Sequence, residues 1–219
     1  MNFASFDFNY DPLRSKGIKD KAWKEVKDWA LSLVYVAVVY LTCTTIWAEG
    51  YLIPSGSMEP TFHGDPNLFK GDRIFALKWI ACQTPFKRGD IVIFVSVEDQ
   101  ETFIVKRLVG LPGDTVEIKN SQVWINGAPL VDPPVFKNIT YYQAHIGSIK
   151  TTFSEQRLEN PVQGFGTQPY TVPKDCFFVM GDNSSSSNDG RYWGPLPMRN
   201  VMGKARLIWW PPKRIKIIE

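Results

Sequence analysis

The sequence predicts a mainly β protein in which a single N-terminal transmembrane helix precedes a compact antiparallel β domain. Two observations carry this prediction. Residues 30–48 form an uncharged, largely apolar run that is long enough for a membrane helix. Beyond residue 48 the chain consists of short apolar or alternating segments separated by Gly, Pro and Asn, which is typical of strands joined by turns. The length of 219 residues fits one domain with a small appendage.

The composition disfavours several classes of protein. A hydrophobic content of 44% is too high for intrinsic disorder and sufficient for a core. A net charge of +3 is too small to indicate a nucleic-acid partner. We expect no metal and no organic cofactor, because the cysteines and histidines form neither a zinc pattern nor an HExxH motif; they are Cys43, Cys82, Cys176, His63 and His145. The composition leaves the oligomeric state open.

The predicted transmembrane signal anchor covers residues 29–48. A helix over residues 30–48 is about 28 Å long, close to the thickness of the hydrocarbon core. Trp29 and Trp47 lie at its ends, where indole rings favour the membrane interface. One alternative is a buried core helix, although such helices usually have a polar face. The other is a cleaved signal peptide, which the bulky Ile46 two residues before Ala48 disfavours.

The flanking charges predict the orientation of this anchor. No Lys or Arg follows it before Lys70, whereas the segment before it is rich in both; those cations are Arg14, Lys16, Lys19, Lys21, Lys24 and Lys27. The positive-inside rule therefore places residues 1–28 in the cytoplasm and residues 49–219 outside it.

Short strands are predicted for the rest of the chain. We expect a hairpin of residues 114–118 and 122–125, followed by a turn at Asn126-Gly127, which is a strong hairpin signal. Residues 131–171 show weak periodicity, so an inserted loop or β-ribbon is expected there. The further predicted strands are residues 90–97, 102–109, 175–180 and 201–209.

A serine-rich turn is the first candidate for chemistry. Residues 53–61 place Pro and Gly around the two hydroxyl groups of Ser55 and Ser57. Such a turn fixes an irregular backbone that can aim a hydroxyl and a backbone N–H at one point. The alternative is a plain surface turn, and the residues by themselves do not favour Ser57 over Ser55.

Lys106 is the second candidate. In a strand over residues 102–109 it shares a face with the apolar Ile104 and Leu108. An ordinary lysine is neutral in roughly one molecule in a thousand at pH 7.4, but burial can lower its pKa by about 3–5 units. A neutral Lys106 can take the proton of a serine hydroxyl. The alternative is an edge strand whose cationic side chains reach water.

Four segments, in this order after a single apolar run, resemble the bacterial type I signal peptidases (leader peptidases), a family with a serine/lysine dyad. They are residues 54–61 (PSGSMEPT), 88–94 (RGDIVIF), 105–114 (VKRLVGLPGD) and 180–194 (MGDNSSSSNDGRYWG). The resemblance implies that residues 49–219 form an extracytoplasmic catalytic β domain, of the signal-peptidase and LexA-like type, with the 131–171 insertion.

The resemblance also implies roles for individual residues. Ser57 matches the family nucleophile and Lys106 the general base. The hydroxyl of Ser55 matches an oxyanion donor, together with the N–H of Ser57, and Ser187 matches the serine that positions the lysine amine. Charged residues that hold the site loops together are matched by Arg107, Asp182, Asp189 and Arg191.

The function implied by the resemblance is the removal of signal peptides from secreted preproteins, after small residues at positions −1 and −3. Its partners are preprotein signal peptides and the lipid bilayer, at the inner (plasma) membrane with the catalytic domain on the periplasmic side. LexA-type repressors share the dyad, but they are soluble and carry a DNA-binding region. An organellar processing peptidase and a non-catalytic, membrane-anchored β module that binds extracytoplasmic peptides stay open as alternatives.

Overall fold

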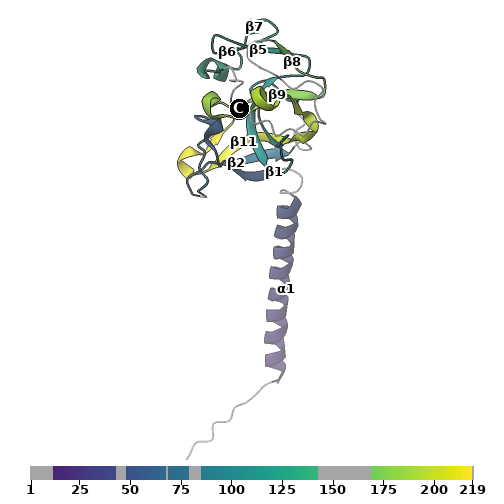
Figure 1. The fold of residues 1–219 in the computed structure, drawn as a ribbon. Coiled ribbons are helices and arrows are strands. Elements are labelled where there is room, and N and C mark those ends of the chain that lie inside the picture. Colours follow the sequence, from purple (N-terminus) through teal and green to yellow (C-terminus); the bar gives the residue numbers. More distant parts are fainter. Residues whose placement is uncertain (1–11, 43–47, 68, 79–84, 143–168, 219) are drawn as a thin grey trace, which may run out of the picture. The chain divides into compact units, whose positions relative to one another are not determined.

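The computed structural model describes residues 12–42, 48–67, 69–78, 85–142 and 169–218. The chain divides into two compact units, Met1–Thr45 and Ile46–Glu219. Each unit is described by itself (Figure 1).

The first unit contains the helix α1, Pro12–Thr42. Among the described residues, none of the helices is both long and apolar enough to cross a membrane, so the transmembrane helix predicted over 29–48 is not supported. From Trp29 to Thr42 the helix rises about 20 Å, less than the hydrocarbon thickness of about 30 Å. Residues 43–47 lie outside the described residues. The predicted end of the helix at Ala48 is wrong, because Ala48 pairs with Leu77 in a sheet.

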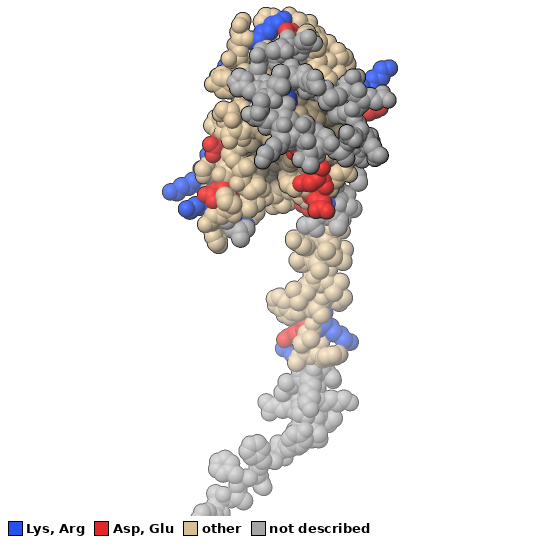
Figure 2. Space-filling view, in the orientation of Figure 1, with Lys and Arg blue, Asp and Glu red and all other residues tan. Residues whose placement is uncertain are grey.

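Charge is unevenly distributed along the described part of α1. Figure 2 shows Lys, Asp and Glu side chains at one end of it and none along the rest. The apolar side chains beyond that charged end are exposed, among them Leu31, Leu33, Val34, Val36 and Val38.

The second unit is built from antiparallel strands, as expected, since every strand pairing among the described residues is antiparallel. The large sheet has the order β1-β2-β11-β3-β4-β9-β10, with β12 also paired to β11. A small sheet has the order β7-β6-β5-β8 and lies at the opposite end of the unit from β1 and β2 (Figure 1). The large sheet comprises β1 Ala48–Leu52, β2 Arg73–Lys78, β3 Ile91–Val95, β4 Phe103–Gly110, β9 Cys176–Met180, β10 Leu196–Pro197, β11 Val201–Trp210 and β12 Lys216–Ile217.

The predicted hairpin is confirmed in the small sheet. It consists of β5 Thr115–Lys119 and β6 Gln122–Ile125, and a second turn at Asn126-Gly127 leads to β7 Ala128–Pro129. Both residues of that turn have positive φ, 52° and 82°, which is the geometry that makes Asn-Gly a hairpin signal. The strands predicted at 90–97, 102–109, 175–180 and 201–209 are also present, as β3, β4, β9 and β11.

Other elements were not foreseen from the sequence. β1 contains Glu49 and Gly50 and lacks a clear alternating pattern, so its strand conformation depends on pairing with β2. In the predicted insertion 131–171, the structure has a 3₁₀ turn at Pro134–Asn138 and the short strand β8, Tyr170–Thr171. Residues 143–168 lie outside the described residues.

Three buried apolar clusters support the second unit. One of them combines Ile53, Met58 and Phe62 with residues of β2, β3 and β11. This cluster therefore fixes the serine-rich turn to the large sheet. A second cluster packs Trp193 against Phe94 of β3, with ring centroids 5.8 Å apart, and so holds the short helix α2, Gly190–Trp193.

Candidate active site

The serine-rich turn forms a short 3₁₀ helix, Gly56–Met58. Met58, the last residue of this helix, and Phe62, four residues later, are both buried. The N–H of Phe62 donates to the carbonyl of Met58 over 3.0 Å. These apolar anchors leave Ser57 half-buried and Ser55 exposed. The segment is thus a fixed platform rather than a plain surface turn.

Lys106 lies inside the large sheet. Its strand β4 pairs with β3 up to Arg107 and with β9 from Arg107 onward. Lys106 and Arg107 are both buried, so the alternative in which their cationic side chains reach water is wrong. The side chain of Lys106 is only 3% exposed, and its partner across the ladder, Val92, is fully buried. The Lys106 Nζ atom donates a hydrogen bond of 2.6 Å to the Ser57 Oγ atom. The fold therefore joins two residues that lie 49 positions apart.

Burial changes the protonation of Lys106. Removal of the ammonium group from water lowers the pKa of Lys106 from 10.5 to about 8, against the opposing effect of the Asp189 and Asp182 carboxylates; the Arg191 charge lowers it further. At pH 7.4 a lysine with that pKa is neutral in roughly one molecule in five. A neutral amine at 2.6 Å can accept the hydroxyl proton of Ser57, which makes Ser57 a stronger nucleophile.

The Asp182 carboxylate is held by Arg107. The Arg107 Nε and NH2 atoms donate to its two oxygens over 2.8 and 2.6 Å, and both side chains are buried. The remaining Arg107 nitrogen donates to the Gly89 carbonyl over 2.7 Å, and the hydroxyl of Thr61 donates to Asp182. This pair therefore joins β4, the loop after β9 and the segment that follows Ser57.

The Asp189 carboxylate is held in the same way by Arg191. Its oxygens accept bonds of 2.8 Å from both Nε and NH2 of Arg191, and one from the N–H of Gly181 at 2.9 Å. Arg191 also donates to the carbonyl of Tyr142 and to the hydroxyl of Ser184. The carboxylates of Asp182 and Asp189 are thus both compensated by bidentate arginine contacts in a buried setting.

Ser187 lies at this second ion pair. Its hydroxyl donates to Asp189 over 2.7 Å, and among the described residues the Lys106 amine is not one of its hydrogen-bond partners. The Oγ atom of Ser55 lies 3.4 Å from the Oγ of Ser57. The structure therefore brings Ser55 and Lys106 into contact with Ser57 and places Ser187 beside Asp189.

Two residues of this site were missed from the sequence. The backbone N–H of Asn183 donates to the Ser57 carbonyl over 3.1 Å, and its side-chain amide donates to the Gly56 carbonyl over 3.0 Å. At Gly181 a β-carbon would overlap the Ser187 hydroxyl and lie 2.6 Å from the Ser57 carbonyl oxygen. The Gly-Asp-Asn sequence at 181–183 could have indicated these two residues, but only the fold shows that their backbone packs against Ser57.

The histidines and the other cysteines of the sequence analysis lie away from this site or outside the described residues. His63 is half-exposed and its Nδ1 atom lies 3.3 Å from Glu59, whereas His145, Cys43 and Cys82 are outside the described residues. Within the described part of the chain, no group of three or more His, Cys, Asp or Glu residues is arranged to hold a metal ion.

Comparison with known proteins identifies one family. The model described as "Signal peptidase, peptidase S26" matches residues 26–210. "Signal peptidase I P" of Bacillus subtilis subsp. natto is 34% identical over 90% of this chain and 97% of its own length. "Signal peptidase I" of Pseudomonas aeruginosa is 33% identical over 86% of this chain and 74% of its own. A solved signal peptidase I of Enterococcus faecalis V583 is 30% identical and covers 55% of this chain and 97% of its own, but its TM-score of 0.37 is too low to support an argument.

The reactivity of Ser57 should depend on pH through Lys106. Acylation of Ser57 by a small fluorophosphonate should accelerate as pH rises through about 8, because deprotonation of Lys106 creates the base. The measurement is the rate of labelling from pH 6 to pH 10, with the labelled residue located by mass spectrometry. A labelling rate that still rises at pH 10 would show that the pKa of Lys106 is not lowered.

The close packing at Gly181 gives a second prediction. Gly181→Ala should slow the labelling of Ser57 by at least about tenfold, because its β-carbon displaces Ser187 and the Ser57 backbone. Gly50→Ala is the matched control, since its β-carbon would meet only Phe75 at an ordinary 3.6 Å. Equal labelling rates in two folded variants would contradict the packing argument.

Proposed function

Because the chain belongs to the peptidase S26 family, the signal peptidases, we propose that it cleaves preproteins with Ser57 as nucleophile and Lys106 as general base. The family supports removal of signal peptides by a serine peptidase. The observation that supports the dyad is the 2.6 Å contact between the Lys106 amine and the Ser57 hydroxyl, with the lysine almost fully buried.

The reaction follows from this contact. Neutral Lys106 takes the proton of Ser57, and the Ser57 oxygen attacks the scissile carbonyl carbon. The bond to the leaving amine breaks as that amine receives the proton from Lys106, which leaves an ester between Ser57 and the signal peptide. Lys106 then deprotonates a water molecule, which hydrolyses the ester and regenerates the hydroxyl.

The neighbouring polar groups have supporting roles in this proposal. The Ser55 hydroxyl, 3.4 Å from the Ser57 Oγ atom, donates to the oxyanion together with the N–H of Ser57. Ser187 supports the lysine pocket through Asp189. The buried ion pairs fix the loops around the dyad; they are Arg107 with Asp182 and Arg191 with Asp189.

An open sheet edge supports binding of an extended peptide. β9 pairs with β4 only from Arg107 onward, so the part of β4 before Lys106 lacks a strand partner on that side among the described residues. Phe103 is exposed there, and Ile104 and Val105 are half-buried. A signal peptide that adds a strand to this edge runs alongside β4, which places its scissile carbonyl group next to the dyad. We propose that small residues at positions −1 and −3 are selected against this apolar surface.

Membrane attachment is a further part of the proposal. The sequence has an uncharged run at 30–48, and the large apolar side chains of α1 within it are exposed. We propose that this run attaches the chain to the membrane, with residues 1–28 cytoplasmic and the catalytic residues 49–219 on the extracytoplasmic side. Attachment to the bilayer that holds the signal peptide raises the effective concentration of substrate.

The open edge of β4 also fits the alternative function, a membrane-anchored module that binds peptides without cutting them. That function makes no use of a lysine buried against a serine. Burial of an amine costs free energy, so the contact between Lys106 and Ser57 favours the peptidase.

Substitution of the dyad tests the proposal. Ser57→Ala and Lys106→Ala should each lower cleavage of a preprotein in detergent micelles by at least about a thousandfold, because either change removes the nucleophile or its base. The measurement is the cleavage rate, together with sequencing of the new N-terminus, which should follow a small residue.

Two control variants belong to that experiment. Ser186→Ala changes an exposed serine beside Ser187, and Lys119→Ala changes an exposed lysine on the small sheet. Both should cleave at the wild-type rate. Cleavage that survives loss of Ser57 and Lys106 would refute the dyad, and peptide binding without cleavage by the wild type would favour the binding module.

A lysine placed in the apolar run tests membrane attachment. Val36→Lys should release the full chain from membranes at neutral pH, because a charge within the run opposes insertion. Val26→Lys is the matched control, since Val26 lies among the charged residues of α1 and is also exposed. The measurement is the fraction of protein in the membrane pellet, and a wild-type chain already in the supernatant would contradict the proposal.

A further inference from the structure

The segment that carries Ser57 is a loop whose two ends meet at Asp72. At the start of the loop, the N–H of Ile53 donates to the Asp72 carbonyl over 2.9 Å. At its end, the N–H of Asp72 donates to the His63 carbonyl over 2.9 Å, and the N–H of His63 donates to Oδ2 of the Asp72 side chain over 2.8 Å. Ser55 and Ser57 lie between these ends, so the position of Asp72 constrains both.

The Asp72 side chain is fully buried, with 0% of the residue exposed. Burial of a carboxylate is costly unless a cation compensates it. Among the described residues, that cation is Arg214, whose Nε and NH2 atoms donate to the two carboxylate oxygens over 2.8 and 2.9 Å. The NH2 atom also lies 3.5 Å from the Thr61 carbonyl oxygen, inside the loop itself.

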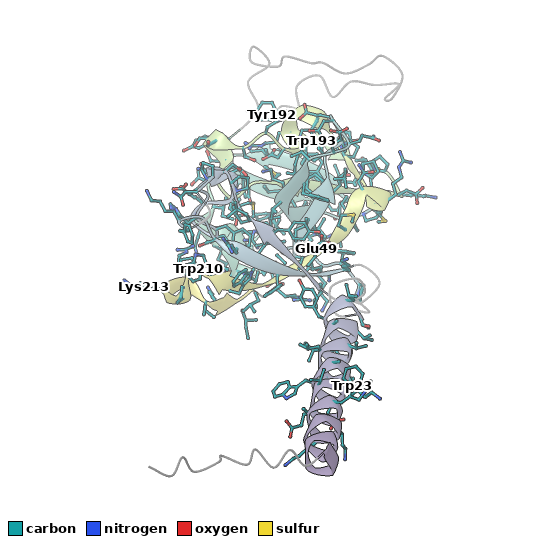
Figure 3. The ribbon with its side chains drawn as sticks, turned by 90° about the horizontal axis from the view of Figure 1, so that it is seen from below. Trp23, Glu49, Tyr192, Trp193, Trp210 and Lys213 are labelled. Carbon is teal, nitrogen blue, oxygen red and sulfur yellow. The ribbon has the colours of Figure 1, made fainter. Side chains whose placement is uncertain are left out.

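Arg214 reaches the loop from the C-terminal part of the chain. It ends the 3₁₀ turn Pro212–Arg214, which follows β11; Figure 3 labels Trp210, the last residue of β11, and Lys213, within the turn. The indole of Trp210 donates to the Phe69 carbonyl over 3.2 Å. Beyond the turn, Ile218 is buried in the same apolar cluster as Ile53, Met58 and Phe62. The C-terminal part therefore supports the loop by both charge and apolar packing.

We propose that Arg214 is a positioning residue for Ser57, acting through Asp72. The short contact between Ser57 and Lys106 requires the loop to stay in place to within tenths of an ångström. Without Arg214, both oxygens of the buried Asp72 carboxylate lose their cationic partner, and the site draws in water. That change weakens the bond of Asp72 to the His63 N–H and loosens the end of the loop. The inference rests on the proposed function for its activity readout only.

The test compares Arg214→Gln with Lys213→Gln in the full chain. Lys213 is the neighbouring exposed cation, and within the described part of the chain it forms no ion pair. Arg214→Gln should lower kcat for preprotein cleavage and the fluorophosphonate labelling rate of Ser57 by the same factor, about tenfold or more, with KM within about twofold. Lys213→Gln should leave all three unchanged. A rise in KM with unchanged labelling would overturn the proposal.

Hydrogen exchange gives a readout that does not depend on activity. Amides of residues 53–63 should exchange at least about tenfold faster in Arg214→Gln than in Lys213→Gln, whereas the amides of β5 and β6 should not change. Equal exchange in residues 53–63 would overturn the proposal. If the wild type cleaved nothing, the proposed function would fail, and this comparison would still decide whether Arg214 holds the loop.

Two more variants separate positioning from general stability. Asp72→Asn combined with Arg214→Gln leaves an amide oxygen that can accept from the His63 N–H without a buried charge. Labelling of Ser57 should therefore be faster in the double variant than in Arg214→Gln alone. Arg214→Lys keeps the charge but not the two parallel hydrogen bonds, so its labelling rate should lie between those of the wild type and Arg214→Gln. If Arg214→Gln does not fold, Arg214→Lys replaces it in the comparison with Lys213→Gln. A double variant whose Ser57 is labelled more slowly than in Arg214→Gln would contradict the pairing.

Discussion

Burial of the Lys106 amine against the Ser57 hydroxyl is the constraint on which the rest of the site depends. A lysine in water is too strongly protonated at neutral pH to act as a base, and burial lowers its pKa to about 8. Two nearby carboxylates, Asp182 and Asp189, oppose that shift. Each is held by a bidentate arginine, Arg107 or Arg191. The Arg191 charge lowers the pKa of Lys106 further. Its ion pair with Asp189 therefore limits the negative field at the lysine in addition to holding the loop.

The fold supplies this environment by placing β4 between two strands. β3 pairs with one side of β4 from Phe103 to Arg107, whereas β9 pairs with the other side only from Arg107 onward. Lys106 is consequently the last residue of β4 before the pairing with β9 begins. The same strand thus offers a buried lysine and, directly before it, a free edge for an extended peptide. One interruption in strand pairing provides both features.

The nucleophile is held from three directions. Met58 and Phe62 anchor its segment in the apolar cluster shared with β2, β3 and β11. Asn183, in the loop after β9, holds its backbone. Asp72, paired with Arg214, joins the two ends of the loop. These supports come from four separate parts of the chain. A serine held in this way loses little conformational freedom when its oxygen attacks, which is the physical advantage of a preorganised site.

The sequence by itself determined the local elements and the residue types. Alternation and Asn-Gly turn chemistry predicted β3, β4, β9, β11 and the hairpin of β5 and β6, because these signals are local. Four ordered segments predicted the family, which the comparisons confirmed. Only the tertiary structure showed that β1 pairs with β2, that Lys106 is buried, and that Asn183, Asp72 and Arg214 form the contacts around the Ser57 loop. Those facts depend on contacts between distant residues, up to 142 positions apart for Asp72 and Arg214, and no local pattern encodes such a distance.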